Sequence, residues 1–143
     1  MSEQDNIRLV QKAYDCFKSG KIDELVKLNA ENIEWTTPGP PEVMLTAGTR
    51  HGRQAVADFF STLDSQEEIE VFEPEEFIAQ GDKVVSLIKC RTRVKATGKS
   101  ADTTLVHVFD IKDGMITRFR EFFDTAAVLP AFVATKAAGS TQV

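Results

Sequence analysis

The sequence contains little cysteine, which removes several classes of protein. Cys16 and Cys90 are the two cysteines among 143 residues, and they form no C-x-x-C motif. A disulfide scaffold needs several bridges, and a zinc or dithiol centre needs closely spaced ligands. The sequence also has no phosphate-binding loop, nucleophile elbow or metal-ligand cluster. We therefore expect neither a metal nor a cofactor.

Long apolar stretches and an excess of positive charge are also absent. No run approaches the ~18 apolar residues of a membrane span, and the first residues, MSEQDNIRLVQ, lack a basic start followed by an apolar segment. Seventeen Lys and Arg stand against 22 Asp and Glu, giving a net charge of −5. A nucleic-acid-binding surface normally needs a basic face. The composition predicts a cytoplasmic protein without a membrane or nucleic-acid partner.

Length and apolar content suit one domain with a sizeable core. The chain has 143 residues, of which 42% are apolar. We expect a single domain over residues 1–143, in which residues 129–143 form a partly disordered tail.

The N-terminal part of the chain has the periodicity of helices, and the rest has the pattern of strands. Apolar residues recur at helical spacing over residues 5–19, 22–28 and 54–63. Strands are predicted over residues 32–37, 69–78, 83–97, 103–111 and 115–123. The last four are joined by short turns that each contain glycine, and such turns require antiparallel neighbours. A long irregular loop follows Pro38 and extends to Gly48.

The order of these elements and several motifs resemble the SnoaL-like branch of the nuclear-transport-factor-like superfamily. The resemblance extends to Leu129 and rests on residues 10–12 (VQK), 17–20 (FKSG), 52–56 (GRQAV), 59–60 (FF), 107–114 (HVFDIKDG) and 116–126 (ITRFREFFDTA). The last run looks like that of bacterial proteins described as ketosteroid-isomerase-related. The resemblance implies an α+β fold, a cone-shaped, barrel-like roll with three N-terminal helices packed on a curved antiparallel sheet that encloses a pocket.

Steroid isomerases are one group of relatives, and they use an Asp base with an oxyanion hole formed by a Tyr and a protonated Asp. The resemblance places Thr37 at the base and Val106 at the acidic donor. It places Ala13 at the tyrosine donor, with Tyr14 one residue away, which rotates a helical side chain by about 100°. Threonine is no base near neutral pH, so this constellation disfavours steroid-type isomerisation.

Epoxide hydrolases are another group, and they use two carboxylates bridged by an arginine. The resemblance places Glu121 at one carboxylate and Arg91 at the arginine, whereas Arg93 occupies the position of the second carboxylate. Side chains alternate along a strand, so Glu121 should lie between Phe119 and Phe123 in an apolar setting that raises a carboxyl pKa. We predict that Glu121 and Arg91 are catalytic. The alternative is a structural ion pair between them.

The predicted pocket is mainly apolar, with a few polar points. Its substrate-binding residues are predicted to be Trp35, Thr37, Leu87, Lys89, Val106, Val108, Phe119 and Phe123. Trp35 is either a stacking wall of this pocket or ordinary core. Two functions remain open: an acid–base enzyme of isomerase, cyclase, dehydratase or epoxide-hydrolase type acting on a small apolar molecule, and a non-catalytic binding module for such a ligand.

The face of the sheet away from the helices is expected to meet a second copy of the chain. Three short helices cover one face, so the other face should form a homodimer contact. Alternation places His107 on this outer face together with Phe109, Phe122 and the arginines. His51 is interpreted as an exposed loop histidine, and Asp124 as a turn or cap residue.

Overall fold

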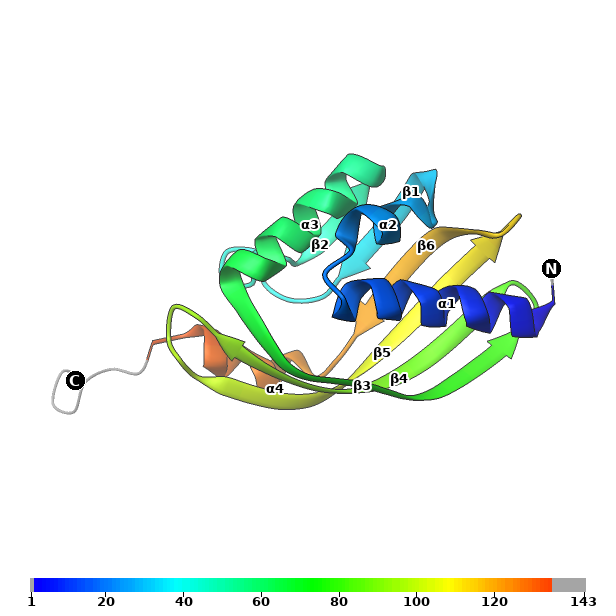
Figure 1. Ribbon diagram of the computed structural model, residues 1–143. Coiled ribbons are helices and arrows are strands. Elements are labelled where there is room, and N and C mark those ends of the chain that lie inside the picture. The colour runs from blue at the N-terminus through cyan, green and yellow to red at the C-terminus, as the bar shows by residue number, and fades with distance from the viewer. Residues whose placement is uncertain (1, 135–143) are drawn as a thin grey trace, which may run out of the picture.

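Helices cover one side of a curved sheet in the computed structural model, which describes residues 2–134. Helices α1 (Glu3–Lys18), α2 (Ile22–Lys27) and α3 (Arg53–Gln66) lie on the same side of the strands (Figure 1). Ser2 begins α1 with a capping box, in which its hydroxyl accepts from the Asp5 N–H and its own N–H donates to the Asp5 carboxylate. The predicted α+β architecture is confirmed.

The sheet has six strands in the order β2-β1-β6-β5-β4-β3. The strands are β1 (Asn29–Thr37), β2 (Gly48–His51), β3 (Glu67–Gln80), β4 (Lys83–Val94), β5 (Ser100–Lys112) and β6 (Met115–Phe122). Strands β3 to β6 form the antiparallel meander that their short turns predict, whereas β1 runs parallel to β6. The sheet ends at β2 and β3 and does not close, so the expectation of a barrel-like roll is wrong in this respect.

Local chemistry explains the turns and the interruption of β3. Asp113 and Gly114 both have positive φ, 53° and 75°, as a type I′ hairpin turn requires. Pro74 lies within β3, where the register shifts between Pro74 and Glu76. An edge strand tolerates this proline because the missing N–H has no neighbour to bond.

The core lies between the helices and the inner face of the sheet. Val10 of α1 and Val56 of α3 are fully buried against Ile33 and Ile88 from the strands. Apolar side chains recur at helical spacing in α1, and buried positions alternate with more exposed ones along β4, so each element presents one buried face to this layer.

The chain after β6 folds back onto the end of the sheet. Asp124 caps α4 (Thr125–Val128) by accepting the Ala127 N–H at 3.2 Å, which confirms its predicted cap role. The 3-10 turn η1 (Leu129–Phe132) follows, and the Thr97 hydroxyl donates to the Ala131 carbonyl at 2.6 Å. The predicted tail overlaps this ordered turn, and its residues 135–143 lie outside the described residues.

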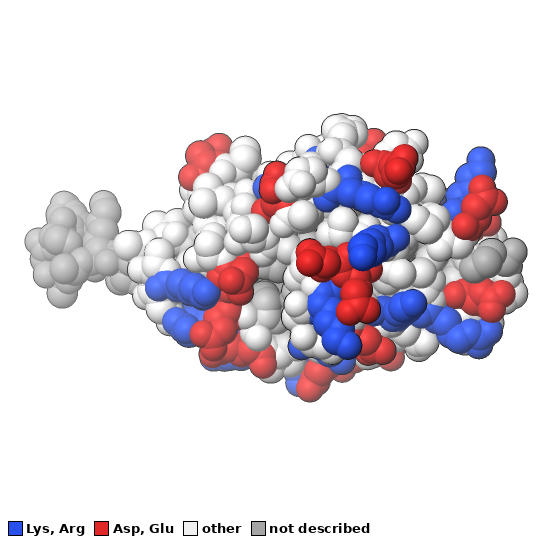
Figure 2. Space-filling model, turned by 45° about the horizontal axis from the view of Figure 1, so that its top comes forward, with Lys and Arg blue, Asp and Glu red and all other residues white. Residues whose placement is uncertain are grey.

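The surface carries charges of both signs. In the view of Figure 2, Lys and Arg side chains lie beside Asp and Glu side chains, and no large area belongs to one sign. Within residues 2–134, no helix has the length and apolar character needed to cross a membrane.

Candidate functional site

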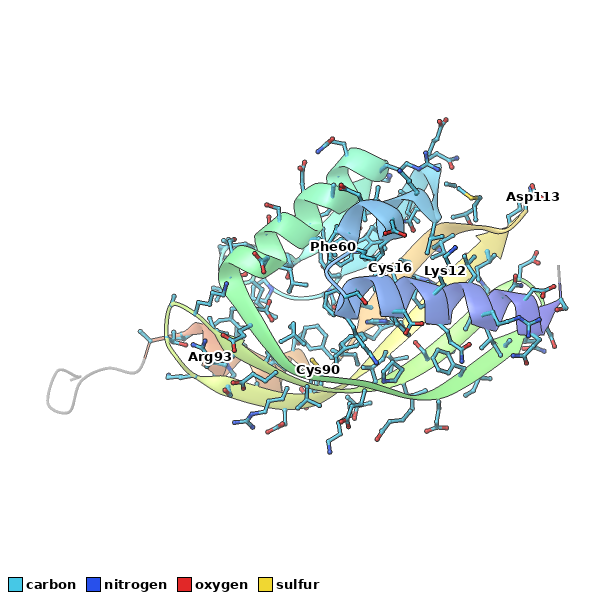
Figure 3. All side chains as sticks on the ribbon, in the orientation of Figure 1. Lys12, Cys16, Phe60, Cys90, Arg93 and Asp113 are labelled. Atoms are coloured by element: carbon cyan, nitrogen blue, oxygen red, sulfur yellow. The ribbon has the colours of Figure 1, made fainter. Side chains whose placement is uncertain are left out.

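A cavity of about 110 Å³ lies between the helices and the inner face of the sheet. Aromatic rings dominate its lining, and the closest pair is Trp35 of β1 and Phe119 of β6, stacked with ring centroids 3.9 Å apart. Phe60 from α3 and Cys90 from β4, both labelled in Figure 3, line the cavity from opposite sides. Residues of both layers therefore build the cavity.

A continuous chain of hydrogen bonds runs along one wall. Tyr14 of α1 bonds through its hydroxyl to the Ser86 hydroxyl and to His107 Nδ1, the latter at 2.8 Å. His107 Nε2 lies 2.8 Å from Glu121 Oε2. Ser86, His107 and Glu121 are neighbours across β4, β5 and β6, because Ser86 pairs with His107 and His107 with Glu121.

The donors in this chain follow from the charge of Glu121. An ionised carboxylate only accepts, so His107 Nε2–H donates to it. In a neutral imidazole Nδ1 is then the acceptor, the Tyr14 O–H donates to it, and the Ser86 O–H donates to the tyrosine oxygen. In an imidazolium, Nδ1–H donates instead and Tyr14 donates to Ser86. The hydroxyls therefore accommodate both charge states of His107 by rotating.

Burial controls the ionisation of several groups that line the cavity. Burial raises the pKa of Tyr14 strongly, against an opposing effect of its bond to Ser86, and the charge of Glu121 raises it further. Burial also raises the pKa of the Cys90 thiol to about 12, assisted by nearby carboxylates including Glu121. Both groups are therefore neutral at physiological pH.

Glu67 is a second carboxyl group that lines the cavity. Its Oε1 accepts the Thr92 hydroxyl at 2.8 Å. Burial raises the pKa of Glu67, the Thr92 bond opposes this, and the charge of Glu121 adds to it. Neither Lys nor Arg is among the described residues that line the cavity. Within residues 2–134, no three His, Cys, Asp or Glu side chains are grouped so that they could hold a metal ion.

Four predicted site residues lie at this cavity. Trp35, Phe119, Glu121 and Phe123 all line it, as the alternation along β1 and β6 predicts. Thr37 is buried, and its hydroxyl donates to the carbonyl of Thr46, a lining residue, while Thr37 itself is absent from the lining.

The predicted faces of β4 and β5 are wrong. The buried positions of β4 are Val84, Ser86, Ile88, Cys90, Thr92 and Val94, and those of β5 are Leu105, His107, Phe109 and Ile111. Leu87, Lys89, Arg91, Val106 and Val108 alternate with them and face away from the helices. A shift of one residue in the alignment exchanges the two faces of a strand. Matching β4 and β5 to the relatives introduced such a shift.

Arg91 consequently does not pair with Glu121. Its guanidinium donates to Glu70 at 3.2 Å and to Asp102 at 2.7 Å, on the outer face, where 44% of the side chain is exposed. Arg93 bonds Glu68 in the same row. Charged side chains remain hydrated on this face, which is the physical reason for the orientation of β4.

His107 is likewise inside and not on the outer face. Its exposed fraction is 4%, and Phe109 beside it in the same alternation is 2% exposed. His51 is exposed as predicted, although it belongs to the unpredicted strand β2. Strand pairing supplies the missing signal: if Glu121 points inward, its antiparallel partner His107 must do so as well.

The comparisons with known proteins agree with this fold. The family model of the SnoaL-like domain matches residues 10–119. An NTF2-like protein from Burkholderia xenovorans is 32% identical with a TM-score of 0.85, covering 93% of this chain and 99% of its own. An NTF2-like protein of unknown function from Burkholderia pseudomallei is 28% identical with a TM-score of 0.84, covering 94% and 100%. TerC, co-crystallised with polyporic acid, is 27% identical with a TM-score of 0.77, covering 86% and 94%. No match was found among the curated proteins. The matched domain spans most of the chain, and the protein belongs to the SnoaL-like family.

Proposed function

We propose that this protein is an acid–base enzyme that moves protons on a small, neutral, apolar molecule, with Glu121 as the base. The observation that carries the proposal is the hydrogen-bonded chain from Tyr14 through His107 to Glu121 at the wall of an apolar cavity. Hydrogen-bonded titratable groups that line an apolar cavity are typical of catalytic sites.

His107 and Tyr14 act as positioning residues in this proposal. The His107 bond occupies Oε2 of Glu121, and within residues 2–134 no hydrogen bond engages Oε1. Oε1 is therefore the atom that takes a proton from the substrate. A carboxylate held by one strong donor in a low-dielectric cavity keeps its orientation as its charge changes.

The lining defines the class of substrate. A cavity with carboxyl groups and no lining Lys or Arg disfavours an anion, and the aromatic walls favour a flat apolar molecule. The volume is of the same order as the ~150 Å³ cavity that holds benzene, which corresponds to a one-ring compound. The buried indole N–H of Trp35 has no partner within the described residues and would be satisfied by a carbonyl or hydroxyl oxygen. The small molecule crystallised with TerC supports a ligand in this fold.

Isomerase, cyclase or dehydratase chemistry fits these groups better than epoxide hydrolysis. The hydrolase pattern needs an arginine between two carboxylates, and Arg91 lies on the other face of β4. Proton transfer at a carbon beside a carbonyl needs a base and a donor for the oxygen, and both kinds of group line this cavity.

Deuterium exchange tests the proposal without knowledge of the natural product. The protein is incubated in D₂O with a set of one-ring ketones, and deuterium at the carbon beside the carbonyl is measured by mass spectrometry. The exchange rate should be about 10²-fold or more lower in Glu121→Gln than in the wild type. Glu68→Gln is the matched control, because Glu68 bonds Arg93 on the outer face. Equal exchange in wild type and Glu121→Gln would refute the role of Glu121.

A non-catalytic binding module is the second candidate, favoured by the aromatic lining of the cavity. Trp35, the one tryptophan of the chain, stacks within that lining and reports binding by fluorescence. A ketone that quenches Trp35 with micromolar affinity but shows no catalysed exchange would favour this candidate.

We also propose that the outer face of the sheet forms a homodimer contact. Phe122 is 48% exposed there and pairs with Val106, next to the partly buried Leu87. His107 and Phe109 no longer belong to this contact. Sedimentation equilibrium should give a dimer for the wild type and a monomer for Phe122→Glu; a monomeric wild type at micromolar concentration would overturn the proposal.

A further inference from the structure

Glu67 differs from Glu68 and Glu70, the other glutamates at the start of β3, in the partner of its carboxyl group. Glu67 and Ile69 point into the cavity, whereas Glu68 and Glu70 point outward. Each outward glutamate meets an arginine, Glu68 at 2.5 Å from Arg93 and Glu70 at 3.2 Å from Arg91. The inward carboxyl meets the neutral Thr92 hydroxyl instead.

The position of Glu67 at the end of α3 fixes this direction. It is the residue after the helix, with extended backbone (φ −132°, ψ 149°), and its N–H donates to the Leu63 carbonyl. The backbone is thus held by both the last helical turn and the first pair of the sheet, Glu67 with Val94. A carboxyl group on such a rigid junction is well placed to contact a ligand reproducibly.

The titratable neighbours of Glu67 give its anion no compensation. Glu121 and Cys90 approach through the cavity. Asp23, Asp64, Glu68 and Lys95 line a groove on the other side of Glu67. The single cation of this set, Lys95, donates to the backbone carbonyl of Asp64 at 2.5 Å.

The two carboxyl groups of the cavity have different hydrogen-bond partners. Glu121 is hydrogen-bonded to a ring nitrogen of His107, whereas Glu67 is hydrogen-bonded to the Thr92 hydroxyl. Two nearby carboxylates in an apolar site do not both ionise readily, and different surroundings separate their roles. When Thr92 donates to Oε1, a proton on Oε2 of Glu67 remains available to a ligand.

We propose that Glu67 is the general acid of the cavity and donates a hydrogen bond, and then a proton, to the carbonyl oxygen of a neutral ketone. This inference rests on the proposed function of Glu121. Glu121 takes a proton from the carbon beside the carbonyl, the C–H electron pair forms the C=C bond, and the carbonyl π pair takes the proton of Glu67. The products are the enol, protonated Glu121 and ionised Glu67.

The second half of the cycle restores both groups. Protonated Glu121 returns a proton to a carbon of the enol, and ionised Glu67 takes back the O–H proton as the carbonyl forms again. The net change is an exchange or shift of hydrogen, with no other reactant. Glu67 also lines the outer groove, which gives its carboxyl a route to protons from solvent.

Acetophenone labelled with ¹³C at its carbonyl is the probe that separates the two proposals. A hydrogen bond from Glu67 lowers the carbonyl stretching frequency of the bound probe, and this shift should persist in Glu121→Gln and disappear in Glu67→Leu. Deuterium exchange should fall about 10²-fold or more in Glu67→Leu. Glu67→Gln keeps a donor but no transferable proton, so it should retain binding and lose exchange. Glu70→Gln, at an outward glutamate that lines neither the cavity nor the groove and pairs with Arg91, should match the wild type in both measurements.

The outcomes distinguish failure of the acid from failure of the enzyme. Exchange that is lost in Glu121→Gln but unchanged in both Glu67 variants would refute the role of Glu67 and leave the proposed function intact. If the wild type binds the probe without catalysed exchange, the enzyme proposal and the acid role both fail. A carbonyl shift unaffected by Glu67→Leu would likewise refute the hydrogen bond. Folding of each variant is checked by circular dichroism, and Glu67→Gln provides the second test if Glu67→Leu does not fold.

Discussion

Removing the hydroxyl of Tyr14 should destabilise the protein more than an ordinary surface change. Tyr14→Phe keeps the ring and its edge contact with Phe72, but leaves Ser86 and His107 Nδ1 without their shared partner. Ser86 is 0% exposed and His107 4%, so water cannot easily replace the lost bonds. An unsatisfied buried group costs roughly 1–3 kcal/mol, so we expect a loss of about 2–4 kcal/mol. In a domain of this size that lowers Tm by roughly 6–15 °C.

Urea unfolding measures this loss of stability, and a double-mutant cycle shows how much of it comes from the interaction between Tyr14 and Ser86. The midpoint should fall while the m-value stays constant. Tyr14→Phe/Ser86→Ala removes both hydroxyls, and its loss should be about 1 kcal/mol smaller than the sum of the single losses. Thr104→Val, an exposed outer-face control, should change stability by less than about 0.5 kcal/mol. A Tyr14→Phe loss as small as that of the control, or strict additivity in the cycle, would refute the reasoning.

Three further predictions follow from the charges. Arg91→Met should leave the carboxyl ¹³C titration of Glu121 unchanged, because the guanidinium lies on the opposite face of the sheet; a change of one pKa unit would contradict this orientation. The raised pKa of Glu67 means that the folded state releases this proton at higher pH than the unfolded chain, so the contribution of Glu67 to stability falls as the pH rises above about 4.5. Glu67→Gln should therefore gain stability over the wild type from pH 4 to 8 in urea unfolding, and a constant difference would refute the shift. In Cys16→Ser, the remaining Cys90 should react with a maleimide at pH 8 only as fast as the protein unfolds, because its pKa is about 12; rapid labelling of the folded protein would show an accessible thiolate.

Most elements of the fold could be predicted because their signals are local. The apolar spacing of α1, the glycine of each hairpin turn and the alternation along β6 all act within a few residues. The parallel pairing of β1 with β6 and the short strand β2 depend on contacts between distant segments. Neither carries a local pattern, because a strand at the edge of the sheet with mostly exposed residues has no apolar alternation.

The site could be predicted only in part, since its residues meet through strand register. Phe119, Glu121 and Phe123 were placed correctly because aromatic residues flank the carboxylate on one strand. The inward face of β4 carries the small or polar residues Ser86, Cys90 and Thr92, which resemble an exposed face in the sequence. Its outward face carries Leu87 beside the charged positions. Alternation alone could not decide between these two faces.

The charges of β4 and the pairing with β6 together decide the register. Lys89, Arg91 and Arg93 form one row on β4, and burying three cations in an apolar cavity would be far more costly than burying a thiol and a hydroxyl. Fixing that row outward sends Ser86 inward, and the ladder then aligns Ser86, His107 and Glu121 side by side.

The same comparison of costs applies to the polar groups that do lie inside. The Glu67 carboxyl is hydrogen-bonded to the Thr92 hydroxyl, whereas an arginine in that place would stabilise its charge. The indole N–H of Trp35 has no partner within residues 2–134. An apolar side chain at either position would fold at lower cost, because each of these groups loses hydration without full compensation. Polar groups that lower the stability of the fold in this way can instead form hydrogen bonds with a bound ligand. The unpaired donor of Trp35 and the carboxyl group of Glu67, whose pKa burial raises, line one cavity and are therefore the physical reason to expect a neutral ligand with a hydrogen-bonding oxygen.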